Sequence, residues 1–471
     1  MTAVLLAYLA VLAVIAFKST RSVKEIADFF VAKKGASSRA VSGSLVASIL
    51  GGSAIIGAVD AGPRLGGAAA WFMLTGALGL LALIPLSKRA YTLGKYSLPD
   101  LIENMYGKGP RAVAAIVIPL AWTGIIAAQI IAAAKLLQSF APVNYESAAA
   151  IVAAVFTLYT MAGGQHSILR TDFLQAVIIV VGLAVLAVFC LASTKNGIPA
   201  QNIAQIGEQA PAFPFNANFS PIDLLLLLLT YGTTFTAGPD IFSRLFCAKD
   251  ARTAKKSISI AATVLVPVAI VIGYLAAFGV TIENPQGARI TAIAQQVLPP
   301  PLIPLIAVML LSVVLSSADT LLLSSSVIIC SQFIARDESA LARLNFFERH
   351  PLFAARLVTT INGGAALCIA LNFTDIISTL LLALAVYAGA FTIPVLWGLF
   401  GFRSKPGFVA AAIIAGGAIA LVAKLLENTE SLQALSLLAG GHLVDILTVA
   451  AFAVNGLLLA IGKTSTNQLK K

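Results

Sequence analysis

Long apolar runs follow one another along this chain of 471 residues, and they leave little choice of fold. Each has about 16 residues or more, which is enough or nearly enough to cross roughly 30 Å of hydrocarbon as a helix. With 59% hydrophobic and only 11% charged residues, the chain does not have the composition of a water-soluble protein. The sequence predicts an all-α polytopic membrane protein in the lipid bilayer, with thirteen transmembrane helices at 2–17, 40–60, 66–86, 112–138, 147–162, 172–193, 221–242, 257–280, 302–333, 352–371, 375–400, 407–425 and 441–462.

Lys and Arg residues lie mostly on one side of these spans. Thirteen spans put the two termini on opposite sides of the membrane, and an outside N-terminus assigns 26 of the 31 Lys and Arg residues to the cytoplasm. Cytoplasmic loops of membrane proteins carry an excess of these residues. We therefore expect an inner (plasma) membrane protein whose C-terminus is cytoplasmic. The same bias explains the net charge of +11 without nucleic acid as a partner.

Two of the predicted spans are interrupted by glycine. The second span contains Gly51-Gly52, and the seventh contains Gly232 and Gly238-Pro239. Gly and Pro release backbone carbonyls from the hydrogen bonds of a helix, and in lipid these groups need protein, water or a ligand as a partner. Two broken helices five spans apart are the arrangement that an inverted repeat of five plus five helices places around a central binding site.

This repeat divides the chain into five parts. We expect an N-terminal extra helix with a cytoplasmic loop, a first five-helix repeat, an outer loop, a second five-helix repeat, and two C-terminal accessory helices with a short cytoplasmic tail. Their predicted boundaries are 1–39, 40–193, 194–220, 221–400 and 401–471.

The ninth span contains a stretch of polar side chains, 311–326. Several of them share one helical face, with Ser317 on its flank: Ser312, Ser316, Asp319, Thr320 and Ser324. Carboxylates and hydroxyls inside a membrane are costly unless they face a partner, water or an ion, and their oxygens are the ligands that hard cations prefer. Serines alone often bond to helix carbonyls or allow helices to pack closely. With Asp319 among them, we expect an ion or proton site.

Four stretches, in this order, resemble the sodium:solute symporter family, which includes the sodium/glucose, proline, pantothenate and sialic acid transporters. They are SLVASILGGS from Ser44, YTMAGG from Tyr159 with LRTDFLQ from Leu169, GPDIFSRLF from Gly238, and SSADTLL from Ser316. The likeness covers residues 40–400. It implies a leucine-transporter-like core of ten helices and a transporter rather than an enzyme.

The resemblance also implies a Na⁺ site. In the family, a Na⁺ lies between the unwound part of the first core helix and the eighth core helix. By position, the ligands here are three backbone carbonyls and two hydroxyls: those of Ala47, Leu50, Val313, Ser316 and Ser317.

A second cation site of some family members is implied at Asp172, Asp319 and Thr320. Asp172 matches the acidic position at the start of the fifth core helix, and the other two match hydroxyl positions on the eighth. Two facing carboxylates repel each other unless a cation or a proton lies between them, so a second Na⁺ and H⁺ are both open. The alternative for Asp172 is a salt bridge with Arg170 or Arg244 at the inner surface.

The resemblance places the solute at mid-membrane, between the two broken helices. The candidate residues are Gly52, Ser53, Gln129, Tyr231, Thr234 and Phe235, with Tyr387 as a lid; the alternative for the aromatic ones is packing or contact with lipid. Ser53-Ala54-Ile55 replaces the amide and acidic side chains of the sugar carriers, and Ile49 replaces an Asp of the proline carriers. These departures favour an amino acid or a short carboxylate as the small-molecule solute.

We therefore expect Na⁺-coupled symport of a small organic solute by alternating access. A proton-coupled carrier of the same fold and a transport-like solute sensor are the alternatives, although the tail at 463–471 carries no signalling domain. An intramembrane enzyme is disfavoured because HExxH and GxSxG motifs are absent, and we assign no catalytic residues. The isolated Cys and His residues indicate no zinc, haem or disulfide framework. The sequence carries no signal for the oligomeric state.

Overall fold

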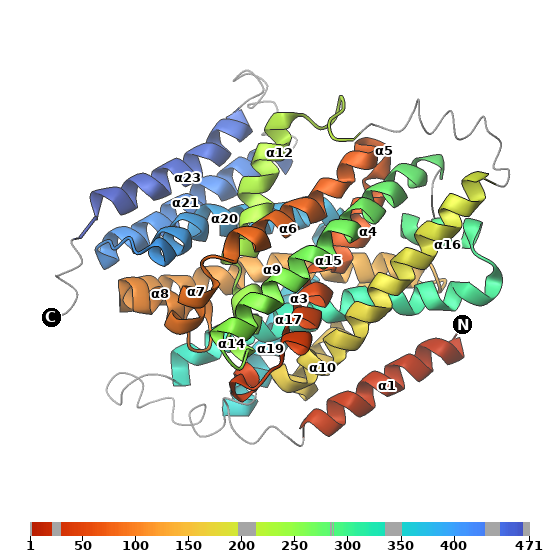
Figure 1. Ribbon diagram of the computed structural model, residues 1–471, viewed down its shortest axis with the longest axis horizontal. Coiled ribbons are helices and arrows are strands. Elements are labelled where there is room, and N and C mark those ends of the chain that lie inside the picture. Colours follow the sequence, from red (N-terminus) through yellow and green to blue (C-terminus); the bar gives the residue numbers. More distant parts are fainter. Residues whose placement is uncertain are drawn as a thin grey trace.

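The computed structural model of the protein is almost entirely helical (Figure 1). It describes residues 2–20, 30–195, 213–282, 285, 287–334, 351–428 and 443–464. The helices of its first half are α1 (Thr2–Thr20), η1 (Ala32–Lys34), α3 (Ser38–Ile49), α4 (Gly52–Asp60), α5 (Gly62–Leu65), η2 (Gly66–Ala69), α6 (Ala70–Leu83), α7 (Ser87–Leu93), α8 (Leu98–Tyr106), α9 (Lys108–Gln138) and α10 (Tyr145–Lys195).

The second half begins with a further broken helix. Its elements are α12 (Pro221–Leu227), the π-helical turn η3 (Leu228–Gly232), α13 (Thr233–Ala237), α14 (Pro239–Cys247), α15 (Ala251–Phe278), η4 (Gly279–Thr281), α16 (Arg289–Val297), η5 (Pro300–Leu302), α17 (Ile303–Ile334), α19 (Pro351–Asn372), α20 (Ile376–Phe400), α21 (Pro406–Asn428) and α23 (Leu443–Ile461).

Within the described residues, eleven helical segments are long and apolar enough to cross a membrane. They correspond to eleven of the predicted spans. The other two predictions, 2–17 and 147–162, correspond to α1 and to the shorter apolar helix Tyr145–Met161. The polytopic helical class is thus confirmed, whereas the count of thirteen and the five-part division of the chain stay predictions.

Both predicted helix interruptions are present. Helix α3 ends at Ile49, Leu50 and Gly51 leave the helical conformation, and α4 starts at Gly52. In the second half, Gly238 adopts an extended conformation (φ −70°, ψ 136°) between α13 and α14. A third break falls inside α10, where Gly164 has φ 61°, a value that glycine adopts without steric cost. The helices therefore change direction at glycines.

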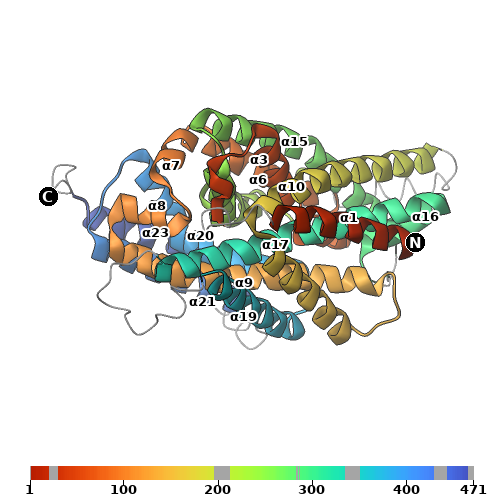
Figure 2. The ribbon, with the colours of Figure 1, turned by 90° about the horizontal axis from the view of Figure 1, so that it is seen from below.

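Helix α17 lies at the centre of the bundle. It packs against α3, α9, α10 and α19, so its polar stripe is surrounded by protein on several sides. Helix α1 packs against α10 and α17 on one side of the molecule, which Figure 2 shows from below. Helices α21 and α23 pack against α20 on the opposite side (Figure 1).

Candidate functional site

The break after α3 lies directly against two serines of α17. The hydroxyl of Ser316 donates to the carbonyl of Ala47 over 2.9 Å and lies 3.2 Å from the carbonyl of Val313. The hydroxyl of Ser317 donates to the carbonyl of Ser48 over 2.9 Å. The last carbonyls of a helix have no partner within it, and together they carry a partial negative charge. Hydroxyl and carbonyl oxygens therefore converge where a cation is favoured.

Glycines make this close approach of α17 to the break sterically feasible. Leu50, the buried residue directly after α3, is the C-cap of this helix. A Cβ atom added to Gly51 would lie 2.4 Å from the hydroxyl oxygen of Ser317, and one added to Gly52 would lie 2.6 Å from a methyl group of Val314. Both distances are shorter than real contacts, so larger residues would push α17 away from the end of α3.

The predicted second cation site holds an arginine. The guanidinium of Arg244 lies 3.8 Å from a carboxylate oxygen of Asp172 and donates to the hydroxyl of Thr320 and, over 3.3 Å, to that of Ser44. Ser44 in turn donates to the same carboxylate oxygen of Asp172. Both charged side chains are fully buried. The salt bridge between Asp172 and Arg244 is thus present, but inside the protein rather than at the inner surface.

The burial of Arg244 corrects one assumption of the charge count. The sequence assigned this residue to the cytoplasmic surface, because it lies near the predicted inner end of the seventh span. Its backbone belongs to the short helix α14, but its side chain reaches inward to Asp172 on α10 and Thr320 on α17. A buried charge needs a partner, and the three helices supply it.

Asp319 lies beside this cluster without joining it. Its side chain is 1% exposed, and neither carboxylate oxygen has a hydrogen-bond partner among the described residues. Asp172 and Arg244 are both within electrostatic range of it. A buried carboxylate without a protein partner calls for water, a proton or a cation. Of the three predicted residues, the structure therefore brings Asp172 and Thr320 together around Arg244, with Asp319 adjacent.

The two broken helices enclose a small central cavity of about 60 Å³. Five predicted solute residues line it: Ser53, Gln129, Tyr231, Thr234 and Phe235. The amide of Gln129 donates to the hydroxyl of Ser53 over 2.7 Å, which connects α9 to the first turn of α4. Gly52 does not line the cavity, but lies against Gln129. Five of the seven predicted solute residues thus line one cavity.

Trp122 and Asp240 are among the lining residues that the sequence reasoning missed. Trp122 lies seven residues before Gln129, a spacing that puts both on one face of α9. Asp240 follows the Gly238-Pro239 break directly and lies in the first turn of α14. An acidic residue immediately after a helix break was the signal that could have identified it.

Tyr387, predicted as a lid, does not line the cavity. Its ring packs edge-on against Trp122 at a centroid distance of 4.6 Å and stacks on Phe391 at 5.0 Å. Its hydroxyl donates to the carbonyl of Ala237 over 2.5 Å. Tyr387 therefore contacts the end of α13 directly before the second helix break, and its role as a lid stays a prediction.

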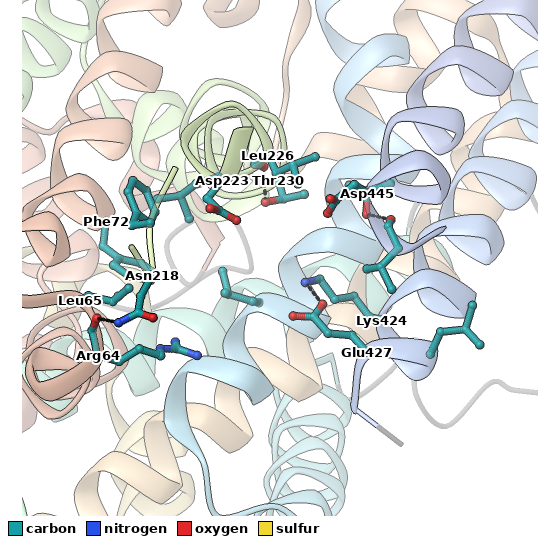
Figure 3. Close-up of a pocket in the computed structure, with 16 residues that line it drawn as sticks. Arg64, Leu65, Phe72, Asn218, Asp223, Leu226, Thr230, Lys424, Glu427 and Asp445 are labelled. Carbon is teal, nitrogen blue, oxygen red and sulfur yellow. Dashed lines mark hydrogen bonds and ion pairs between the residues drawn. The ribbon is translucent and has the colours of Figure 1, made fainter. Parts of the chain in front are cut away.

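A larger cavity of about 500 Å³ lies between α5, α12, α20, α21 and α23 (Figure 3). Charged side chains surround it, among them Arg64 and the ion pair of Lys424 with Glu427. Phe72 lines this larger cavity and Tyr231 lines the central one, and their ring centroids lie 5.8 Å apart. The two members of one edge-to-face aromatic pair thus line one cavity each.

The sequence of this chain matches a known protein family and several curated transporters. The model of the Sodium:solute symporter family matches residues 29–416. The osmoregulated proline transporter OpuE of Bacillus subtilis (strain 168) is 24% identical over 427 residues, covering 86% of this chain and 84% of that protein. The sodium/proline symporter of Escherichia coli (strain K12) is 24% identical over 442 residues, covering 87% and 85%.

Solved structures of transporters share the fold. A Na⁺-coupled sialic acid symporter in a substrate-bound, outward-open state superposes with a TM-score of 0.77 at 15% identity, over 98% of this chain and 96% of that one. Mhp1, a nucleobase-cation-symport-1 family transporter, reaches a TM-score of 0.55 at 14% identity, over 92% and 93% of the two chains. The inverted-repeat, leucine-transporter-like fold is confirmed.

The family match spans most of the chain and includes all four stretches that carried the sequence resemblance. Its members are transporters rather than enzymes, and they use Na⁺ to move solutes across membranes. On this evidence, the chain belongs to the sodium:solute symporter family.

Proposed function

We propose that this protein is a Na⁺-coupled symporter that carries a small amino acid by alternating access. The observation that supports this most directly is the contact between the hydroxyl of Ser316 and the carbonyl of Ala47 at the end of α3. A single ion at this point would connect α17 to the first broken helix. Ion occupancy would then favour one arrangement of the two helices over another.

We assign the first Na⁺ to five oxygens, those of the predicted carbonyls and hydroxyls of Ala47, Leu50, Val313, Ser316 and Ser317. The hydrogen bonds of Ser316 and Ser317 to backbone carbonyls support this assignment, because they bring ligand oxygens of both helices together. On Na⁺ binding, each hydroxyl would turn its lone pairs to the ion. Oxygen ligands of this kind suit a hard monovalent cation.

The groups that line the central cavity favour the binding of a zwitterionic solute. The N-terminus of α4 lies at Gly51 and Ser53, and helix N-termini attract carboxylates. The carboxylate of Asp240 on the opposite broken helix would attract a solute amino group. Because the cavity is small and Tyr231 and Phe235 form an aromatic wall, a compact and partly apolar amino acid fits best.

We further propose that the solute enters through the larger cavity of Figure 3 and passes the aromatic pair of Phe72 and Tyr231. The pattern of Lys and Arg residues supports an orientation in which this cavity faces outward, with the N-terminus outside and the C-terminus in the cytoplasm. The plasma membrane is the expected location.

Transport coupling needs only that ion and solute each bind better when the other is present, by typically about 1–3 kcal/mol. The membrane potential adds about 2.3 kcal/mol per charge per 100 mV. Together these terms allow one Na⁺ to drive substantial accumulation of the solute.

Proteoliposomes test this function. We expect an inward Na⁺ gradient to drive uptake of one or a few radiolabelled amino acids from a panel that also contains sugars and short carboxylates. The same solutes should raise the thermal unfolding temperature of the purified protein more in Na⁺ than in choline. Equal uptake in Na⁺ and choline for every solute would contradict Na⁺ coupling, and uptake of a sugar instead would contradict the solute class.

A further inference from the structure

An apolar groove of about 270 Å³ lies where α3 packs between α10 and α15. Its walls include Ser42 and Gly43 of α3, Phe173 and Val177 of α10, and Ile260 of α15. Phe173, Val177 and Ile260 are apolar and yet 45%, 48% and 36% exposed. Exposed apolar surface of this kind marks contact with a partner or with the membrane. In a chain that spans the bilayer, the groove therefore faces hydrocarbon.

The length and chemistry of the groove match one acyl chain. Because Gly43 has no side chain, the ring of Phe173 lies directly against α3; a Cβ atom added there would lie 2.7 Å from it. Ser42 donates its hydroxyl to the carbonyl of Arg39 in its own helix over 3.3 Å, so this hydrogen is already used. From Phe173 to Val181 the groove follows α10 for about 12 Å, close to half of the roughly 30 Å of a hydrocarbon core. The groove thus fits a chain from one membrane leaflet.

The three helices that form the groove begin at the same end of the bundle. Ser257, near the start of α15, donates to the carbonyl of Ser38 at the start of α3 over 3.3 Å. Ser44 of α3 donates to Asp172, which lies in the part of α10 that follows the break at Gly164. Because both contacts join early turns, the three helices run in the same direction. The pattern of Lys and Arg residues assigns their first turns to the cytoplasmic side.

Each of these helices carries a basic residue just before the groove. They are Arg39 on α3, Arg170 on α10 and Lys256 on α15, each three or four residues before the first groove residue of its helix. Residues at this spacing share a helical face. All three side chains are exposed. Lys and Arg bind phosphate groups and attract the anionic lipids of the cytoplasmic leaflet. The groove therefore combines apolar walls with a basic rim at one end.

We propose that this groove binds an anionic phospholipid, with one acyl chain against α10 and α15 and the phosphate at Arg39 and Lys256. The charge of the rim selects this occupant, because the apolar walls alone would accept the chain of any lipid. The proposal goes beyond the proposed function and does not depend on the ion or the solute. A lipid bound here contacts α3, the helix that ends at the first break, together with both of its neighbours. Its occupancy would hold α3 against α10 and α15.

Native mass spectrometry of the purified full chain tests the rim by counting bound lipids. We expect one phosphatidylglycerol to bind at least about tenfold more tightly than phosphatidylcholine with the same chains. Arg39→Gln combined with Lys256→Gln should weaken phosphatidylglycerol by roughly 25-fold, since a basic residue near the membrane surface contributes about fivefold. The affinity for phosphatidylcholine should change much less.

Lys108→Gln combined with Lys405→Gln is the matched control. It removes the same charge from two exposed residues that the sequence also assigns to the cytoplasm, on or next to α9 and α21 rather than the groove helices. We expect it to bind phosphatidylglycerol as the wild type does. An equal loss in both double variants would show a general effect of net charge and would overturn the proposal, as would equal affinities of the wild type for the two lipids.

Val177→Trp tests the groove itself. The exposed valine should tolerate the larger side chain, which would fill the groove from α10. Excluding only two methylene groups weakens either lipid by about tenfold. Val188→Trp, at a 61% exposed valine of α10 that does not line the groove, should bind lipid normally. Unchanged affinity in Val177→Trp would overturn the site, and so would displacement of the lipid by equal concentrations of inorganic phosphate, which has no acyl chain.

Discussion

The two broken helices present different chemical groups at their breaks. At the first break, the carbonyls that α3 leaves free accept hydrogen bonds from Ser316 and Ser317, so the break presents oxygen and partial negative charge. At the second break, Gly238 opens the chain between α13 and α14, and the new helix begins with Asp240 beside an aromatic wall.

Under the proposed function, the two breaks of this pseudo-symmetric scaffold would bind different ligands. A helix end that shows only carbonyls and hydroxyls suits a small cation. A break that combines a carboxylate with Tyr231 and Phe235 suits an organic solute with an amino group and an apolar part. We therefore expect substitutions at the first break to change Na⁺ dependence and substitutions at the second to change solute recognition.

The largest effect is expected from Ser316→Ala combined with Ser317→Ala. Each hydroxyl bond to a charged group contributes about 1.5 kcal/mol or more, so losing two should weaken Na⁺ binding by about 100-fold or more. Uptake in Na⁺ should fall to its level in choline while expression is kept. Ser331→Ala is the control on the same helix, because its hydroxyl bonds to the carbonyl of Ile328 within α17. Persistent Na⁺-stimulated uptake by the double variant would show that Na⁺ does not bind at the first break.

Gly51→Ala should have the next largest effect. Its new methyl group would lie 2.4 Å from the Ser317 hydroxyl oxygen, so the serine must move away from the end of α3. We expect a loss of Na⁺ affinity of at least about tenfold, as for displaced metal ligands, measured by ²²Na⁺ binding. Gly364→Ala introduces the same methyl group into open space on α19 and should bind Na⁺ normally. Equal affinity of the two variants would show that contact of Ser317 with the break is not needed.

Asp240→Asn should affect the solute and not the ion. Replacing the carboxylate by an amide removes its attraction for a solute amino group, at a cost of about 1.4 kcal/mol or a tenfold increase in KM. Na⁺ binding measured without solute should not change, because Asp240 lines the cavity at the other break. A shift in Na⁺ affinity without a shift in KM would show that Asp240 acts on the ion and not on the solute.

Tyr387→Phe should have the smallest effect. It removes one hydrogen bond, to the carbonyl of Ala237 at the end of α13, which contributes about 1 kcal/mol. We expect a slightly lower thermal unfolding temperature and a change in KM of a fewfold at most. If KM rose as much as in Asp240→Asn, Tyr387 would contact the solute directly, which would support the predicted role as a lid.

Most of the fold could be predicted because its determinants are local. Apolar length alone identified eleven segments that the structure also gives, and Gly51 and Gly238 marked both breaks because glycine is needed where a helix stops inside a membrane. The contact of Ser316 with Ala47 could be predicted only through the family resemblance. Neither periodicity nor composition pairs residues 269 positions apart.

The sequence did not predict contacts that depend on how far a side chain extends and on how the helices pack. Arg244 was counted at the cytoplasmic surface because the sequence places its backbone near a span end, whereas its long side chain extends to a buried carboxylate. Tyr8 was one polar residue in an apolar run, and only the packing of α1 on α10 and α17 brings its hydroxyl to Ser312. Asp240 directly follows the Gly238-Pro239 break, but only the packing of the helices around the break shows that it lines the cavity.

The most direct test of the ion at the first break is to locate it. Thallium(I) can replace a monovalent cation and scatters X-rays anomalously, so crystals grown with Tl⁺ in place of Na⁺ would show where it binds. We expect an anomalous peak between the carbonyl of Ala47 and the hydroxyl of Ser316, absent from crystals of the double serine variant. A fully occupied peak elsewhere in the wild type, with none between α3 and α17, would contradict the account.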